Sequence, residues 1–220
     1  MVESSVKSWT ATLAAMLIAD GKLGLDDPVS KWIPEWKAGS EGGVTVRHLL
    51  TMTSGLENRT EAGKSSVGFA GDKNAFVFAL PLTYRPGQRW AYSNEGSQML
   101  SPILERAAGM PLEQYARERL FLPLGMRDTE LNVDRAGNPW TYADAFTTLR
   151  DFAKVCQLVL NRGSWNGRQL LAPAWVDSLT RPISQNRGYG MSWWLETNPT
   201  LYATRGHLNT ECYVVPELQL

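Results

Sequence analysis

The sequence contains few of the residues that build metal sites and disulfide frameworks. Its 220 residues include two cysteines, Cys156 and Cys212, and two histidines, His48 and His207. Two isolated cysteines are too few for a disulfide framework or a zinc site, and two histidines argue against a catalytic metal. We therefore expect no metal and no other cofactor.

Excess charge and long apolar runs are also absent. Lysine and arginine together number 22, as do aspartate and glutamate, so the formal charge is zero. Without a basic patch, no nucleic-acid partner is expected. No apolar run reaches the length of a membrane span, and no signal peptide is recognised. The start looks truncated, so the compartment stays open between cytoplasm and periplasm.

An apolar helix near the start is the clearest local feature. From Val6 the apolar residues recur at Trp9, Leu13, Met16 and Leu17, which is the 3.6-residue period of a helix. Alanines fill much of the other side, so we expect a helix that is buried on most faces. The glycine of the following Asp-Gly pair is suited to end it.

Ser4 and Lys7 stand at the beginning of this helix, three residues apart and on one face. Burial would strip water from the amine and lower its pKa, so that the neutral form could accept the serine proton. Ser-x-x-Lys also arises by chance, and Ser4 could be a simple helix N-cap. Ser5 is two residues from Lys7 and would not face it.

Helical patterns dominate the chain as far as residue 180. Helices are expected, among others, at Gly96–Ala108, Asp144–Leu160 and Leu170–Leu179. Three short antiparallel strands are expected afterwards, at Tyr189–Leu195, Leu201–His207 and Cys212–Val215. Helices followed by strands indicate an α+β fold. We expect one domain over residues 1–220, with a mainly helical part over 1–180 and antiparallel strands over 181–220.

Two further motifs follow the Ser-x-x-Lys pair in order. Tyr92-Ser93-Asn94 lies in a loop just before a helix, and His207-Leu208-Asn209 is expected on a strand of the final sheet. Each is weak alone, because an asparagine in a loop usually makes a local backbone hydrogen bond. Together they resemble the serine-reactive superfamily of class C β-lactamases, DD-peptidases and family VIII carboxylesterases. Supporting matches are His48–Leu56, Arg85-Pro86-Gly87 and Phe121–Met126.

The resemblance implies a β-lactamase/transpeptidase-like fold, with a helical lobe and a small antiparallel sheet. It also implies that Ser4 is the nucleophile, that Lys7 helps to remove its proton, and that Tyr92 is a second general base or its relay. A phenol beside an ammonium has a depressed pKa, which suits that role.

Four further residues would handle the substrate. Asn94 would donate to it or hold Lys7 in place, and His207 stands where the β-lactamases keep a lysine. A backbone N–H near Thr210 would join that of Ser4 in holding the oxyanion. Asn209 replaces the glycine expected there, and its side chain narrows the approach.

The chain resembles a family member that is truncated at both ends. Three residues precede Ser4, and the sequence stops before the family's last strand and helix. The sheet is then expected to be incomplete, with unpaired edges. We expect a fragment or a minimal version that forms a homodimer or a domain-swapped oligomer.

The function that the resemblance implies is a serine hydrolase that works through an acyl-enzyme on small esters or amides. Histidine in place of lysine at position 207 removes a fixed charge suited to a β-lactam carboxylate, which favours an esterase. The alternatives are a β-lactamase, a peptidase for D-amino-acid peptides, and an inactive relative that only binds a ligand or partner.

Overall fold

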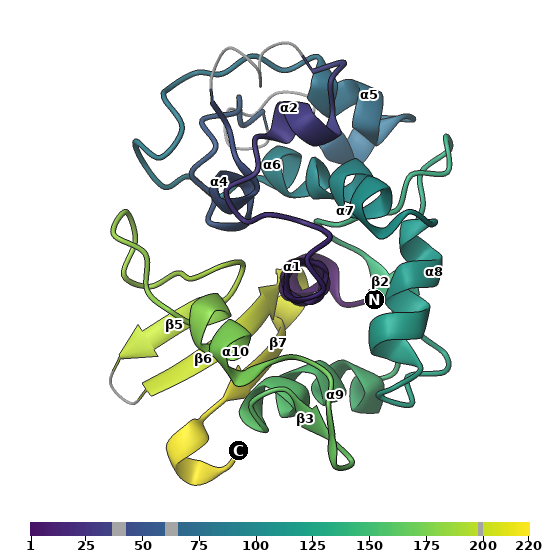
Figure 1. Cartoon of the computed structure of the whole chain (residues 1–220), viewed down its shortest axis with the longest axis vertical. Coiled ribbons are helices and arrows are strands. Elements are labelled where there is room, and N and C mark those ends of the chain that lie inside the picture. Colours follow the sequence, from purple (N-terminus) through teal and green to yellow (C-terminus); the bar gives the residue numbers. More distant parts are fainter. Residues whose placement is uncertain (37–42, 60–65, 198–199) are drawn as a thin grey trace.

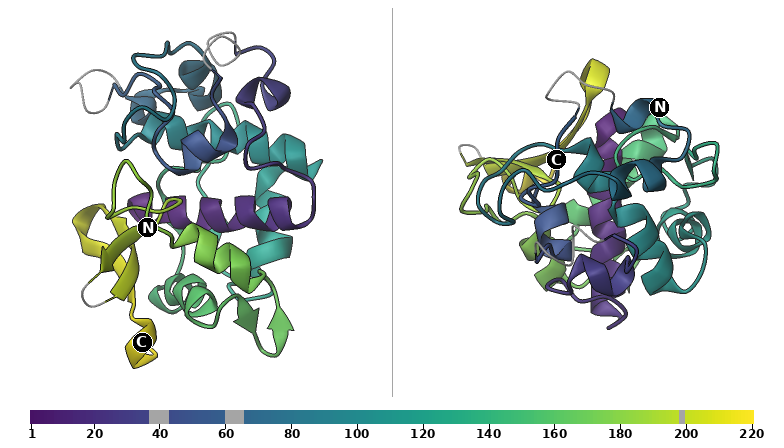
Figure 2. Two further views of the ribbon diagram at one scale, coloured as in Figure 1. Left: turned by 60° about the vertical axis from the view of Figure 1, so that its left-hand side comes forward. Right: turned by 90° about the horizontal axis from the view of Figure 1, so that it is seen from above.

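A central helix organises the computed structural model, which describes residues 1–36, 43–59, 66–197 and 200–220. This helix, α1 (Val6–Ala19), passes through the middle of the molecule (Figures 1 and 2). On one side of it lie α2 (Val29–Trp32), α4 (Val46–Leu50) and α5 (Lys73–Phe78). The three-stranded sheet lies on the other side, with α9 (Leu149–Leu160) and α10 (Pro173–Leu179).

The burial of α1 confirms the helix expected from the apolar pattern. Every residue from Val6 to Leu17 is buried, so the surrounding elements cover nearly the whole surface of the helix. Trp9 packs edge-to-face against Phe121, with ring centroids 5.8 Å apart. Gly21 follows the helix at φ +70°, the left-handed conformation that glycine adopts without strain.

Buried hydroxyl groups of α1 form hydrogen bonds to the main chain on two sides of the helix. Ser8 Oγ donates to the Ser192 carbonyl at 2.6 Å, and Thr10 Oγ1 donates to the Thr141 carbonyl at 3.1 Å. Buried polar atoms need such partners, because an unsatisfied one costs about 1–3 kcal/mol. The start of α1 is therefore held in a fixed position between the two halves of the molecule.

The remaining helices continue around α1. They are α6 (Asn94–Gln98), α7 (Leu100–Ala108) and α8 (Leu112–Ala116), which is followed by a π-helical turn at Arg117–Phe121. Ser93 begins α6, since its Oγ accepts a hydrogen bond from the Gly96 N–H at 2.9 Å. This cap places Asn94 in the first turn of the helix. A glycine at positive φ, Gly109, ends α7.

The principal sheet confirms the three antiparallel strands of an α+β fold. Its strands are β5 (Trp194–Thr197), β6 (Thr200–Gly206) and β7 (Thr210–Val214), in that order across the sheet. Trp194 is paired with Ala203, and Gly206 with Thr210. The Gly206–Thr210 end of the sheet packs against the turn that carries Ser4.

The first strand begins later than the expected Tyr189–Leu195. Tyr189 N donates to the Asn186 carbonyl and Gly190 N to the Trp193 carbonyl, so this stretch folds back on itself. Ser192 has φ +59°, which an extended strand does not allow. The bend brings the Ser192 carbonyl to α1.

The expected helix Asp144–Leu160 is also shorter than its apolar pattern suggested. Its first residues form β2 (Ala145–Phe146), which pairs with β1 (Glu130–Leu131). Thr148 then caps α9 by accepting from the Asp151 N–H at 3.1 Å. A second small hairpin joins β3 (Ser164–Trp165) and β4 (Arg168–Gln169).

Within the ranges given above, no helix is both long and apolar enough to cross a membrane.

Candidate active site

The two serines at the start of the chain have different environments. Both lie in a 3₁₀ turn, Glu3–Ser5, that leads directly into α1. Ser5 is buried and donates from Oγ to the Thr210 carbonyl at 2.6 Å. Ser4 is half-buried, and its Oγ faces Lys7. Ser4 is therefore the serine that meets the amine, as the three-residue spacing predicted.

Lys7 is buried and makes three polar contacts through its amine. Nζ lies 3.0 Å from Ser4 Oγ, 2.8 Å from Asn94 Oδ1 and 2.5 Å from the Tyr142 carbonyl oxygen. Burial lowers the pKa of Lys7, while the nearby Tyr92 phenol acts in the opposite direction. A neutral amine has two N–H donors and one lone pair. Two of the three neighbours can only accept, so the lone pair would be directed at the Ser4 hydroxyl.

Tyr92 stands beside the amine and not directly on the serine. Its ring centroid is 4.8 Å from Lys7 Nζ, and the ring stacks on Trp194 at 5.9 Å with an interplanar angle of 23°. Asn58 Nδ2 donates to its backbone carbonyl. Within the described part of the chain, no hydrogen bond joins the Tyr92 hydroxyl to Ser4. Of the two predicted neighbours of Ser4, Lys7 is in hydrogen-bond contact and Tyr92 is reached through Lys7.

Asn94 is held against Lys7 by its place in the first turn of α6. Its side-chain oxygen accepts a hydrogen bond from the amine, which corresponds to the second of the two roles considered for it. Because the acceptor is a neutral amide oxygen, it orients the amine without adding a negative charge that would stabilise the ammonium.

Tyr142 belongs to the site although no motif pointed to it. Its carbonyl takes the shortest of the three Lys7 contacts, and its ring lies 5.7 Å from Nζ and stacks on Trp140. Burial, followed by the negative charge of Asp144, raises the pKa of the Tyr142 phenol. A contact through a main-chain carbonyl leaves no signal in side-chain patterns, so sequence reasoning could not find it.

His207, Leu208 and Asn209 are not on a strand, which corrects the sequence prediction. They form an exposed 3₁₀ turn between β6 and β7. Leu208 and Asn209 have φ +56° and +59°, and two consecutive left-handed residues reverse the chain and end β6 at Gly206. Leucine rarely adopts this conformation, so the turn is a locally strained connection.

The turn also changes the surroundings of Thr210. Its backbone N–H donates to the His207 carbonyl, and its Oγ1 donates to the same oxygen at 2.9 Å. The N–H expected to face the oxyanion is therefore engaged within the turn.

Burial, and then the neighbouring Asp144, raise the pKa of Glu3, whereas His207 opposes that shift. The imidazole consequently lies within electrostatic reach of the turn that carries Ser4.

His48 is structural in this fold. Thr45 caps α4, and its backbone N–H donates to His48 Nδ1 at 3.1 Å. Burial lowers the pKa of His48. This contact with Thr45 involves none of the residues around Ser4.

Comparisons with known proteins identify a family for this chain. The family described as Beta-lactamase matches residues 1–220. Esterase EstB of Burkholderia gladioli is 38% identical over 143 residues, which cover 57% of this chain and 36% of the esterase. Penicillin-binding protein 4* of Bacillus subtilis (strain 168) is 33% identical over 132 residues, covering 57% of this chain and 29% of that protein. The chain thus spans about a third of the length of these curated relatives.

A solved structure with the same fold extends the likeness to nearly the whole chain. The D-stereospecific amidohydrolase from Streptomyces sp. superposes with a TM-score of 0.78 at 22% sequence identity, covering 99% of this chain and 78% of that one. At this identity the likeness establishes the fold, with its mixture of helices and small antiparallel sheets. The family match over residues 1–220 shows that the chain belongs to the β-lactamase family.

Proposed function

We propose that this chain is a serine hydrolase that forms an acyl-enzyme on Ser4 and acts on small esters or amides. The observation that carries the proposal is the contact between Lys7 Nζ and Ser4 Oγ, made by an amine that is buried and has a lowered pKa. A serine hydroxyl is a weak nucleophile until a base takes its proton, and a desolvated lysine can be that base.

The proposed reaction has two balanced stages. In the first, Ser4 Oγ bonds to the substrate carbonyl carbon while its proton passes to neutral Lys7. The carbon–oxygen or carbon–nitrogen bond to the leaving group then breaks, and the leaving alcohol or amine takes that proton. In the second stage, water attacks the acyl carbon, a carboxylic acid departs, and Ser4 regains its hydroxyl proton.

Tyr92 and Asn94 support this chemistry through Lys7. We assign to the Tyr92 hydroxyl the role of a second general base or its relay, and the position of the ring, 4.8 Å from Lys7 Nζ, supports this assignment. Asn94 and the Tyr142 carbonyl accept the two N–H groups of the neutral amine, which leaves its lone pair for Ser4. General bases of this kind contribute about 10²–10⁴-fold to the rate.

The oxyanion and the rest of the substrate would meet Ser4, His207, Asn209 and Thr210. The Ser4 N–H is the first proposed donor. The Thr210 N–H is the second, and it becomes available when its hydrogen bond to the His207 carbonyl opens. A substrate carbonyl could therefore compete for this donor. His207 and the exposed Asn209 side chain would contact the group beyond the scissile bond.

An esterase is the activity that we favour. His207 replaces the fixed positive charge that would suit a β-lactam carboxylate, and the esterase from Burkholderia gladioli is 38% identical over the matched residues. A β-lactamase and a D-amino-acid peptidase are the alternative hydrolases. The engaged Thr210 N–H favours a different alternative, an inactive relative that only binds a ligand or partner.

We propose in addition that residues 1–220 form a single β-lactamase-related domain, and that a homodimer or a domain-swapped oligomer pairs the edges of its sheet. Among the residues that the structure describes, the outer strands β5 and β7 each have a strand neighbour on one side only. Such edges tend to pair with another chain. Light scattering over a range of concentrations tests the association, and a strict monomer would contradict it.

The test of the hydrolase is an assay with p-nitrophenyl butyrate. We expect ester turnover by the wild type and none above background by Ser4→Ala. Ser178→Ala is the matched control, because the Ser178 hydroxyl bonds only to the Ala174 carbonyl of its own helix. A chromogenic cephalosporin and a D-alanyl-D-alanine peptide, measured in parallel, separate the three hydrolases. Equal rates for the wild type and Ser4→Ala would end the proposal and leave the inactive relative.

A further inference from the structure

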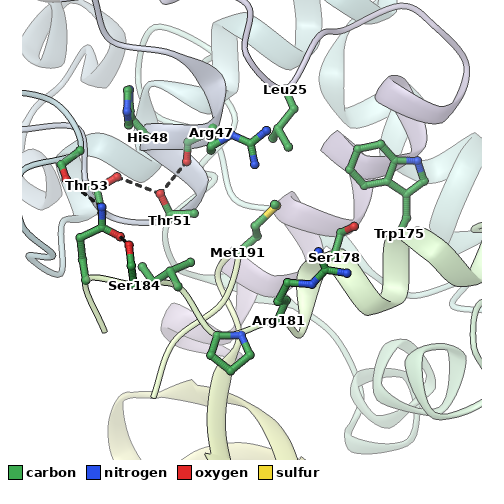
Figure 3. Close-up of a pocket in the computed structure, with 14 residues that line it drawn as sticks. Leu25, Arg47, His48, Thr51, Thr53, Trp175, Ser178, Arg181, Ser184 and Met191 are labelled. Carbon is green, nitrogen blue, oxygen red and sulfur yellow. Dashed lines mark hydrogen bonds between the residues drawn. The ribbon is translucent and has the colours of Figure 1, made fainter. Parts of the chain in front are cut away.

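A cavity lies apart from the proposed nucleophile and base, because neither Ser4 nor Lys7 is among its lining residues. Its volume is about 470 Å³, within the range of small-molecule sites. It opens between α4 and the turn at Gly87 on one side, and α10 with the segment that follows it on the other (Figure 3). Nothing in the proposed hydrolysis uses it.

The charged lining of this cavity is cationic. Arg47 and Arg181 are both lining residues, and no aspartate or glutamate is among them. Arg47 is already paired with Asp26, at 2.6 Å and 2.7 Å. Arg181 is exposed and has no ion pair among the described residues. Its guanidinium brings a positive charge to the rim, within electrostatic reach of Asp177, a carboxylate that is already paired with Arg162.

His48 adds a neutral hydrogen-bond donor. Because its Nδ1 accepts the Thr45 N–H, the neutral ring carries its proton on Nε2. A Cβ atom on Gly87, another lining residue, would lie 3.2 Å from that nitrogen, so Nε2 is directed toward this part of the lining. The neutral ring is the form favoured near neutral pH, since burial lowers the pKa of His48.

Apolar side chains form about half of the remaining wall, and hydroxyl and amide side chains form the other half. Leu25, Trp175, Ile183 and Met191 are among the apolar ones, and Trp175 provides the largest flat surface (Figure 3). A purely ionic ligand such as phosphate would leave this surface unused. A ligand with an apolar body and one anionic end would use both parts of the lining.

We propose that this cavity is a binding site for a small carboxylate with an apolar body, whose carboxylate is held by Arg181 on the side of Ser178 and Met191, while the Nε2–H of His48 lies on the opposite side of the cavity. The apolar body lies against Trp175 and Met191. The site does not depend on the reactivity of Ser4, so it can be tested whether or not the chain is a hydrolase.

Isothermal titration calorimetry with 4-phenylbutyrate tests the site. The neutral amide of the same acid and inorganic phosphate are the comparison ligands. We expect the acid to bind more tightly than either, and Arg181→Met to weaken its binding about three- to tenfold, as for one exposed charge-assisted contact. The matched control is Arg187→Met, an exposed arginine nearby that does not line the cavity. It should bind like the wild type.

A cavity-filling variant gives a second, independent readout. Ser178 lines the cavity, and its hydroxyl bonds only within α10, so Ser178→Phe adds bulk at little structural cost, whereas Ser178→Ala should bind normally. Titrations repeated after fluorophosphonate treatment show whether the ligand sits at Ser4, because binding in the cavity survives labelling. The proposal would be overturned if the protein bound the acid no more tightly than its amide, or no more tightly than phosphate. It would also be overturned if Arg181→Met and Ser178→Phe bound the acid as tightly as the wild type.

Discussion

The amine of Lys7 lies 3.0 Å from the hydroxyl oxygen of Ser4, one helical turn away at the start of a buried helix. Two other acceptors, Asn94 Oδ1 and the Tyr142 carbonyl, contact the same nitrogen, and the Tyr92 phenol lies beside it. This arrangement suits a neutral amine that accepts the serine proton. The functional proposal rests on that protonation state.

Replacing the amine should abolish the reaction without removing the side chain. Lys7→Met keeps a long, unbranched side chain in the buried position but removes the amine that would act as the base. We expect kcat/KM for p-nitrophenyl butyrate to fall by about 10²–10⁴-fold. Lys22→Met is the control, since Lys22 is exposed beyond the other end of α1. Retention of full activity by Lys7→Met would show that another group activates Ser4.

The lowered pKa of Lys7 also predicts how stability depends on pH. Below the folded-state pKa, both the folded and unfolded forms carry the proton, so the group has no effect on the slope. Between that pKa and the ordinary value of 10.5, only the unfolded chain is protonated, so folding stability rises with pH. Relative to Lys7→Met, the wild type should gain up to about 1.4 kcal/mol per pH unit in this window. Urea unfolding at a series of pH values measures it, and parallel curves would contradict it.

Tyr92→Phe separates the phenolic hydroxyl from the packing of the ring. The variant keeps the stacking on Trp194 and the ring beside Lys7, so its thermal unfolding should change little. If the hydroxyl relays the proton, kcat should fall by about 10²-fold or more. A wild-type rate in Tyr92→Phe would remove Tyr92 from the mechanism and leave it as a packing residue.

The hydrogen bond from Ser8 to the Ser192 carbonyl should contribute measurably to stability. Ser8→Ala leaves a buried carbonyl without this donor, which costs about 1–3 kcal/mol. Thr12→Val is the comparison, since the Thr12 hydroxyl bonds only within α1, to the Ser8 carbonyl. Chemical denaturation of both variants compares the two. If both variants lost the same free energy of unfolding, the hydrogen bond from α1 to the bend before β5 would contribute no more than a bond within the helix.

Gly206 lies where the sheet meets the nucleophile turn. A Cβ there would come within 2.3 Å of Thr210 Oγ1 and 2.9 Å of Glu3 Cβ. Gly206→Ala should therefore shift the turn that carries Ser4, lowering both the melting temperature and the esterase rate. At Gly71 the nearest atom would be 4.0 Å away, so Gly71→Ala is the matched control. If Gly206→Ala behaves like that control, the packing is looser than described.

Local features of the sequence predicted the local part of the structure. The period of apolar residues gave α1, and three-residue spacing gave the contact between Ser4 and Lys7. The order of helices and strands gave the α+β fold. These inferences succeed because helix periodicity and contacts within one turn depend on neighbouring residues alone.

Features that depend on distant contacts were not predictable in this way. Tyr142 meets Lys7 through its main chain across 135 positions, and β2 replaces the first part of an expected helix because β1 lies beside it. The turn at His207–Asn209 requires two left-handed residues, Leu208 and Asn209. Leucine rarely adopts this conformation, so its presence at position 208 does not indicate a turn. The bend at Ser192 likewise arises from the approach of α1.

Covalent labelling of the folded protein with a fluorophosphonate tests the central claim most directly. Intact mass followed by peptide mapping identifies the labelled residue and separates Ser4 from Ser5. We expect one adduct, on Ser4, in the wild type, slower labelling in Lys7→Met, and none in Ser4→Ala. A folded wild type that gains no mass, or an adduct on any other residue, would contradict the account.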